Sequence, residues 1–214
     1  VQARKEINLF AERTSRMFGM VKDLLHEENE NEFNKLFSRI EKYENISDNM
    51  ELEIANYLNK VSEGRLSSES KLEIRGMLRE VTEIESIGDS CYNLARTINR
   101  KRSGGNDFTE KQYEHIHQMM QLTDDALAQM IAIVEDDYHV VDVNKTFNLE
   151  NEINNYRAQL KNQNVVDVNN KEYDYQMGVH YMDLIGECEK LADYVVNVVE
   201  ARTNVKEKKT NANR

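Results

Sequence analysis

The chain of 214 residues contains no proline and only 8 glycines, so the two residues that most often interrupt helices are nearly absent. Charged residues make up 31% and hydrophobic residues 39% of the sequence, a balance typical of amphipathic helices rather than of disordered chains. The formal net charge of −11 argues against a general nucleic-acid binder, because contacts with phosphates require a basic face, and it favours cations as ligands.

Apolar residues recur at helical spacing in three segments of the first half of the chain. An acidic break around residues 27–32 separates the first two segments. Ser67 or Ser68 can cap the third segment, and the basic residues 100–102 at its end complement the helix dipole. The predicted helices are residues 2–27, 31–62 and 68–102.

The sequence Ser-Gly-Gly-Asn-Asp at residues 103–107 is the clearest break in the chain and predicts a linker over residues 103–108. Beyond it the helical spacing returns, and the basic residues 205–214 are expected to form a flexible tail. The predicted helices of this part are residues 109–136, 139–163 and 170–204. We therefore predict an all-α fold of six long antiparallel helices, a tandem duplication of a three-helix bundle with halves at residues 1–102 and 109–204.

Acidic residues interrupt the apolar stripe of several predicted helices. In the second helix, Glu44 and Asp48 share one face and stand where the stripe that includes Ile40 should continue. Pairs with the same spacing are Glu85 and Asp89, Glu150 and Asn154, and Glu189 and Asp193. Because carboxylates one turn apart repel each other, protonation, a buried lysine or arginine, or a bound cation must compensate. Carboxylates that converge from neighbouring helices favour a hard metal ion.

A single acidic pair carries little weight, since 39 acidic residues give roughly seven such pairs by chance and most of them are solvated. The order Glu-x-x-x-Asp-x-x-x-Asn, however, occurs twice, beginning at Glu85 and at Glu189, an offset of 104 residues (189 minus 85). The earlier pairs are offset by 106 residues (150 minus 44). These similar offsets indicate one duplication and favour a metal site or a shared polar network over a solvated face.

Residues 84–95 (IESIGDSCYNLA) and 188–197 (CEKLADYVVN) resemble the two signature helices of PhoU proteins. Members of that family are duplicated three-helix bundles in which acidic motifs on two helices of each half bind clusters of metal ions, commonly iron. They take part in the control of phosphate uptake. Residues 175–194 resemble more narrowly the PhoU-like tails of bacterial sodium/phosphate cotransporters.

Carried over residue by residue, the resemblance implies two metal sites. The first comprises Glu44, Asp48, Glu85 and Asp89. The second comprises Glu150, Asn154, Glu189 and Asp193. At Asn154 the sequence departs from the family pattern, and because an amide offers one uncharged oxygen, the second site is expected to be weaker or differently loaded. The metal stays open among iron, manganese, magnesium, zinc and calcium.

The resemblance further implies a non-catalytic, cytoplasmic regulatory domain at the inner face of the cell membrane. Its partner would be a membrane-embedded phosphate transporter, either in the same polypeptide or separate, and a homodimer is compatible with both arrangements. The chain begins at Val1 with no signal peptide, and we expect it to be an excised portion of a longer protein. A free-standing PhoU-type adaptor is the alternative. No membrane span is expected in the chain itself.

Other chemical signals are weaker. Glu114 and His117 have the spacing of one di-iron ligand pair, but no second pair occurs, so an exposed polar face is expected. His115 and His117 should point to different helix faces, and His180 is expected at the surface. No phosphate loop, nucleophile elbow or Cys-x-x-Cys motif supports an enzyme. Buried, reduced thiols are predicted for Cys91 and Cys188, and core positions are predicted for Met17, Met20, Met119, Met120 and Met130.

Overall fold

The computed structural model describes the backbone of residues 2–136 and 142–212 and the side chains of residues 2–136 and 142–204. Within these ranges the chain forms six α-helices and no strand, which confirms the predicted all-α fold. The helices are α1 (Gln2–His26), α2 (Glu30–Ser62), α3 (Ser68–Ser103), α4 (Glu110–Glu135), α5 (Asn144–Asn169) and α6 (Tyr175–Ala212). None of them, over the described residues, is both long and apolar enough to cross a lipid bilayer.

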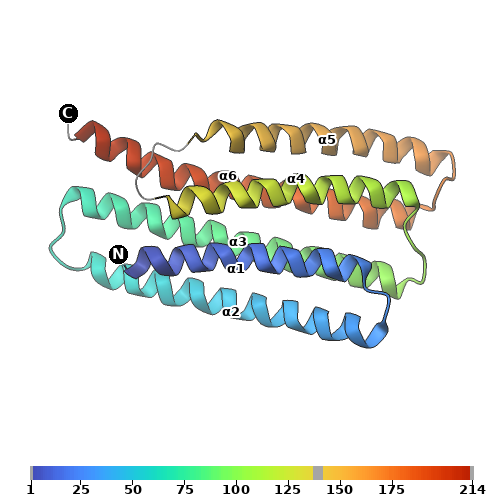
Figure 1. Cartoon of the computed structure of the whole chain (residues 1–214), viewed down its shortest axis with the longest axis horizontal. Helices are drawn as coiled ribbons and strands as arrows, with labels where there is room; N and C mark the ends of the chain where they lie inside the picture. Colours follow the sequence, from blue (N-terminus) through green and yellow to red (C-terminus); the bar gives the residue numbers. More distant parts are fainter. Residues whose placement is uncertain (1, 137–141, 213–214) are drawn as a thin grey trace.

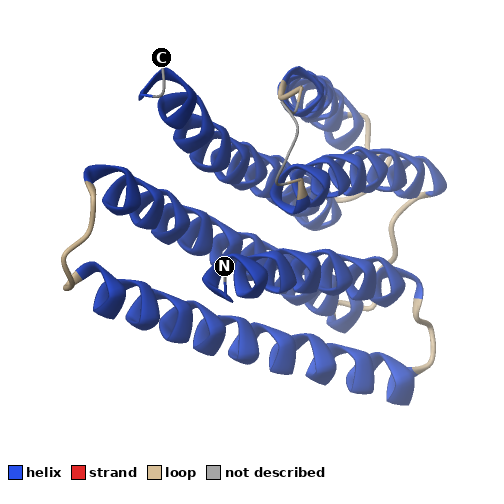
Figure 2. Ribbon diagram, turned by 60° about the vertical axis from the view of Figure 1, so that its left-hand side comes forward, coloured by secondary structure: helices blue, strands red, loops and turns tan. Residues whose placement is uncertain are grey.

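The helices form two layers that follow the order of the chain (Figures 1 and 2). One layer contains α1, α2 and α3, and the other contains α4, α5 and α6. The most extensive contact between any two helices joins α3 to α6, with a further contact between α1 and α4. Over the residues that the structure describes, α2 and α5 each contact only helices of their own half. The two halves are therefore joined through α3 and α6 at the centre of the molecule.

One continuous apolar core runs through both halves. It is built from the faces on which hydrophobic residues recur every three or four positions, and it includes the fully buried Phe10, Phe18 and Leu94. The predictions for the sulfur-containing side chains are confirmed, because both cysteines are buried and free and the five methionines are buried. This core is large enough to hold the fold together without a disulfide or a structural metal.

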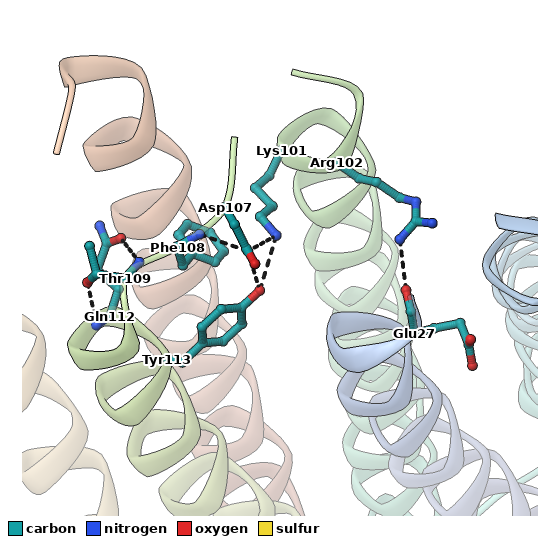
Figure 3. Close-up of polar contacts among 8 residues, drawn as sticks. All are labelled: Glu27, Lys101, Arg102, Asp107, Phe108, Thr109, Gln112 and Tyr113. Carbon is teal, nitrogen blue, oxygen red and sulfur yellow. Dashed lines mark hydrogen bonds and ion pairs between the residues drawn. The ribbon is translucent and has the colours of Figure 1, made fainter. Parts of the chain in front are cut away.

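The short linker between the halves is fixed by polar contacts (Figure 3). Lys101 at the end of α3 pairs with Asp107, which also accepts a hydrogen bond from the hydroxyl of Tyr113. Thr109 then caps α4 in a capping box with Gln112. Arg102 donates 2.8 Å hydrogen bonds to the carbonyls of residues 27 and 28, so the basic end of α3 caps the C-terminus of α1.

Helices α1 to α4 end within one residue of their predicted bounds, and Ser67 is the N-cap of α3. The predicted bounds of the last two helices were wrong. Helix α5 runs from Asn144 to Asn169 instead of 139–163, with residues 137–141 outside the described ranges, and α6 begins at Tyr175 and continues to Ala212, past the predicted end at residue 204.

Helix α5 continues through the polar residues 162–164, past its predicted end at residue 163. The end lies at a Schellman motif, in which the amides of Lys171 and Glu172 donate to the carbonyls of Val168 and Asp167 at 3.1 and 3.0 Å. Lys171 has φ 60°, the left-handed conformation that this motif requires.

Candidate metal centre

Two small residues bring α2 and α3 together at the first acidic group. Ser47 is buried, and a Cβ atom added to Gly88 would lie 3.7 Å from both Cβ and Oγ of Ser47. The Ser47 hydroxyl donates to the Tyr43 carbonyl at 2.8 Å, so it needs no partner on α3. Because the next residues on these helices are Asp48 and Asp89, the close approach at Ser47 and Gly88 brings the acidic faces together.

The four first-half residues predicted from the sequence converge at this place. Glu44 and Asp48 from α2 and Glu85 and Asp89 from α3 each offer a carboxylate oxygen, and these oxygens all lie within 4.8 Å of one another. All four side chains are half-buried. Among the described side chains, no lysine or arginine forms an ion pair with any of them. The negative charge is therefore concentrated and has no counterion among the described side chains.

Burial and mutual repulsion make this group hard to ionise fully. The pKa of Glu44 is raised to about 7, first by burial and then by Asp48 and Asp89. The pKa of Glu85 is raised to about 9, first by burial and then by hydrogen bonds with Asp89 and Asp48. Without a cation, protons shared between the carboxyl groups compensate for the repulsion. A bound cation would displace them.

Sequence reasoning missed a fifth carboxylate. Glu51 follows Asp48 by three residues on α2, and its pKa is raised by burial and then by the charges of Asp48 and Asp89. Glu51 is not one of the four residues whose oxygens converge within 4.8 Å, so it adds negative charge at the rim of the cluster. The spacing of three from Asp48 was the available signal, since residues three apart share a helix face.

The donor set of the first cluster fits a hard metal cation. Carboxylate oxygens from two neighbouring helices are the ligands that such ions prefer, and no ion pair within the described part of the chain offsets their charge. Glu44, Asp48, Glu85 and Asp89 are the residues that would hold the ion.

The second acidic group is built differently. Burial raises the pKa of Glu150 on α5, and the charges of Asp193, Glu200 and Glu189 on α6 raise it further, in that order. The oxygens of the second group do not converge as those of the first group do. Among the described side chains, the first-half residues form the one acidic group whose oxygens all lie within 4.8 Å of one another. Arg157, instead, places its Nε 3.5 Å from Oε2 of Glu189.

The third members of the repeated motif do not face the clusters. Asn93 on α3 donates a 3.3 Å hydrogen bond to Glu187 on α6, and Asn197 on α6 donates a 3.1 Å hydrogen bond to Glu83 on α3. Both offsets are 104 residues (187 minus 83 and 197 minus 93). The acidic residues of the duplicated motif therefore lie beside other acidic residues of their own half, whereas its asparagines form hydrogen bonds between the halves.

The histidines fit the predictions with one exception. His115 contacts the hydroxyl of Tyr181 and His117 contacts His26, so these neighbours do point to different faces. Glu114 and His117 are exposed, as expected of a polar face. The surface position predicted for His180 was wrong, since its exposed fraction is 7%. His180 lies on α6, which packs against α3, α4 and α5 and therefore buries more of its surface than an outer helix.

The fold and this geometry define a class of protein, a duplicated three-helix bundle with a carboxylate cluster between two helices of one half. The family model described as the PhoU domain matches residues 7–98 and 116–201, which fall in α1–α3 and α4–α6. The chain belongs to the PhoU family, as the resemblance of residues 84–95 and 188–197 predicted. No curated protein matches the chain.

Two solved structures have the same fold. The phosphate transport system regulatory protein PhoU from Streptococcus pneumoniae superimposes with a TM-score of 0.77 at 14% sequence identity, over 96% of this chain and 93% of that chain. PhoU from Pseudomonas aeruginosa superimposes with a TM-score of 0.74 at 13% identity, over 97% of this chain and 96% of that chain. At these identities the similarity establishes the fold.

Proposed function

We propose that this chain is a regulatory PhoU-type domain that binds metal cations at the first-half cluster and controls phosphate uptake without catalysing a reaction. The observation that carries the proposal is the convergence of Glu44, Asp48, Glu85 and Asp89 within 4.8 Å with no counterion from the described side chains. Family membership supports the regulatory role, and a solved protein of the same fold is named as a phosphate transport system regulator.

In this proposal a bound cation sets the state of the domain. The four ligands belong to α2 and α3, so an ion held by all of them fixes the two helices against each other. Because α3 also contacts α6 extensively, the bound state is transmitted to the second half. The domain would act in the cytoplasm at the inner face of the membrane, where a transporter can contact a helix face.

The attachment to the transporter has two forms. In the first, the domain is the tail of a sodium-dependent phosphate cotransporter, which the resemblance of residues 175–194 supports. In the second, it is a separate adaptor, which is favoured by the near-complete coverage of the solved PhoU chains, 93% and 96%. Reading the gene upstream of Val1 separates them, because membrane spans in the same polypeptide would support the first form.

Elemental analysis of gently purified protein tests the metal part of the proposal. The native chain should retain metal, and the Glu85→Gln/Asp89→Asn variant should lose it. Glu110→Gln/Glu114→Gln is the matched control, since these two residues have the same spacing on an exposed face of α4 and should be dispensable. Equal metal content in native chain and Glu85→Gln/Asp89→Asn would refute cation binding at this cluster.

The regulatory part is tested by phosphate uptake in cells. Deleting the chain should change the rate of uptake of labelled phosphate, and the native chain should restore it. The Glu85→Gln/Asp89→Asn variant should fail to restore it at equal protein level. An uptake rate that is the same with and without the chain would refute the regulatory role.

A further inference from the structure

The two halves differ in charge at equivalent positions. The offset of 106 residues that relates Glu44 to Glu150 pairs Glu51 with Arg157 (157 minus 51) and Asp48 with Asn154 (154 minus 48). The first-half group thus has five carboxylates and a formal charge of −5, whereas its counterpart has three carboxylates and one guanidinium and a formal charge of −2. The first-half group is Glu44, Asp48, Glu51, Glu85 and Asp89. Its counterpart is Glu150, Asn154, Arg157, Glu189 and Asp193.

Arg157 already serves as a cation for Glu189. The two side chains lie 3.5 Å apart and are 34% and 26% exposed. Arg157 Nε is shielded from solvent and has no hydrogen-bond acceptor among the described side chains, which leaves Glu189 as its electrostatic partner. Burial raises the pKa of Glu189, and Arg157 opposes that rise. The guanidinium is always charged at physiological pH, so its attraction for Glu189 does not depend on a bound ion.

The helix opposite Arg157 has room for it. A Cβ atom added to Gly186 on α6 would lie 3.7 Å from Arg157 Nε, already in contact. The equivalent residue of the first half is Thr82 (186 minus 104), whose branched side chain would need the space that the guanidinium takes. The arginine and the glycine therefore occur together in the second half, and Glu51 and Thr82 occur together in the first.

The residues between the acidic helices are also larger in the second half. Ser47 and Gly88 correspond to Ile153 and Ala192, by the offsets of 106 and 104 residues (153 minus 47 and 192 minus 88). Both of these apolar residues are buried. Isoleucine and alanine are larger than serine and glycine, so the small-residue pair that lies beside the first cluster has no counterpart in the second half.

From these observations we infer that Arg157 is the built-in cation of the second half and that this half binds no metal ion. The inference rests on the proposed function, because it assigns all of the cation binding to the first-half cluster. The halves are then unequal in role: the first responds to the cation, and the second stays in one electrostatic state whatever the cation concentration.

Titration with Mn²⁺, followed by the signal of the free ion in electron paramagnetic resonance, tests the inference on the full chain. The Glu189→Gln/Asp193→Asn variant should bind as much Mn²⁺ per chain as the native protein. The Asn154→Asp/Arg157→Glu variant gives the second half the same acidic residues as the first half, and it should bind at least twice the native amount of Mn²⁺. The gain should disappear when Glu189→Gln is added.

The outcomes separate the two proposals. If Glu189→Gln/Asp193→Asn lowers the Mn²⁺ bound to the otherwise native chain, the inference is wrong, while cation binding as such stands. If the native chain binds no Mn²⁺ but Asn154→Asp/Arg157→Glu gains a Glu189-dependent site, the first-half proposal fails and the inference about Arg157 holds. A correctly folded Asn154→Asp/Arg157→Glu protein, as judged by circular dichroism, that gains no Mn²⁺ overturns the inference. Should that variant not fold, the Glu189→Gln/Asp193→Asn comparison decides.

Discussion

The side-chain amide of Asn93 on α3 donates a hydrogen bond to Glu187 on α6, and the duplication repeats this contact in reverse between Asn197 and Glu83. The third position of the repeated acidic motif therefore joins the halves. Replacing both asparagines by alanine should lower the free energy of unfolding by about 1 to 3 kcal/mol, at about 1 kcal/mol for each hydrogen bond lost. Urea denaturation measures this change.

Asn162→Ala provides the control for this prediction, since Asn162 is exposed on α5. It should change the unfolding free energy by less than about 0.5 kcal/mol. The Asn93→Ala/Asn197→Ala protein should also keep its bound metal, because neither amide belongs to the converging group. Loss of metal from that variant would show that the asparagines act on the cluster.

The stability of the metal-free protein should fall as the pH rises. The pKa values of Glu44 and Glu85, about 7 and about 9 when folded, lie above the unfolded value of 4.5. Their contribution to stability is thus complete below about pH 4.5 and is lost as the pH rises through 7 and 9. Unfolding in urea between pH 5 and pH 9.5, in the presence of a chelator, measures the effect.

Two changes should remove this dependence on pH. Glu44→Gln/Glu85→Gln replaces both titrating groups by neutral amides, and saturating Mn²⁺ replaces the shared protons by an ion. If the unfolding free energy of the metal-free protein falls with pH equally in the native chain and in Glu44→Gln/Glu85→Gln, the pH dependence originates elsewhere in the molecule.

Gly88→Leu should separate the helices that carry the first cluster. The added side chain meets buried Ser47, where even a Cβ atom is already in contact at 3.7 Å. Overpacking of this kind costs about 1 to 3 kcal/mol, and the displaced Asp89 should lower metal binding as well. Gly19→Ala is the matched control, because a Cβ atom there meets nothing within 4 Å and alanine should stabilise α1 by about 1 kcal/mol. Thermal unfolding and metal content together check both variants.

Lys171→Gly should stabilise the protein. Lys171 has φ 60° at the end of α5, a conformation that costs a residue with a Cβ atom about 1 kcal/mol and costs glycine little. We therefore expect the unfolding free energy to rise by up to about 1 kcal/mol, after allowance for the greater freedom of glycine in the unfolded chain. A decrease in the unfolding free energy would mean that the lysine side chain stabilises the protein by more than its left-handed backbone conformation costs.

The sequence was sufficient to predict the regular parts of this fold. Apolar spacing placed α1 to α4 within one residue, because their ends coincide with caps such as Ser67 and Thr109 that local sequence reveals. It failed for α5, which continues past the predicted end at residue 163 and carries the exposed Val165 and Val166 in its last turns. The burial of His180 was also missed, since it depends on how α6 packs in the centre of the bundle.

For the acidic groups, the repeated spacing singled out Glu85 and Glu189, and Asn154 was the signal that the second site is weaker or differently loaded. In the structure, Glu189 differs from Glu85 also through a contact with a residue on the neighbouring helix, its ion pair with Arg157. Such a contact follows from the packing of α5 against α6. The offset that pairs Glu51 with Arg157 was visible in the sequence. It becomes informative only when the structure shows the guanidinium of Arg157 beside the carboxylate of Glu189.

A crystal structure of the native chain soaked in Mn²⁺, with diffraction measured at the manganese absorption edge, would show directly which half binds the ion. We expect anomalous density between Glu44, Asp48, Glu85 and Asp89, and none beside Glu189 while Arg157 is in place. Anomalous density beside Glu189, or its absence from the first cluster in crystals that hold manganese elsewhere, would refute an asymmetric cation site.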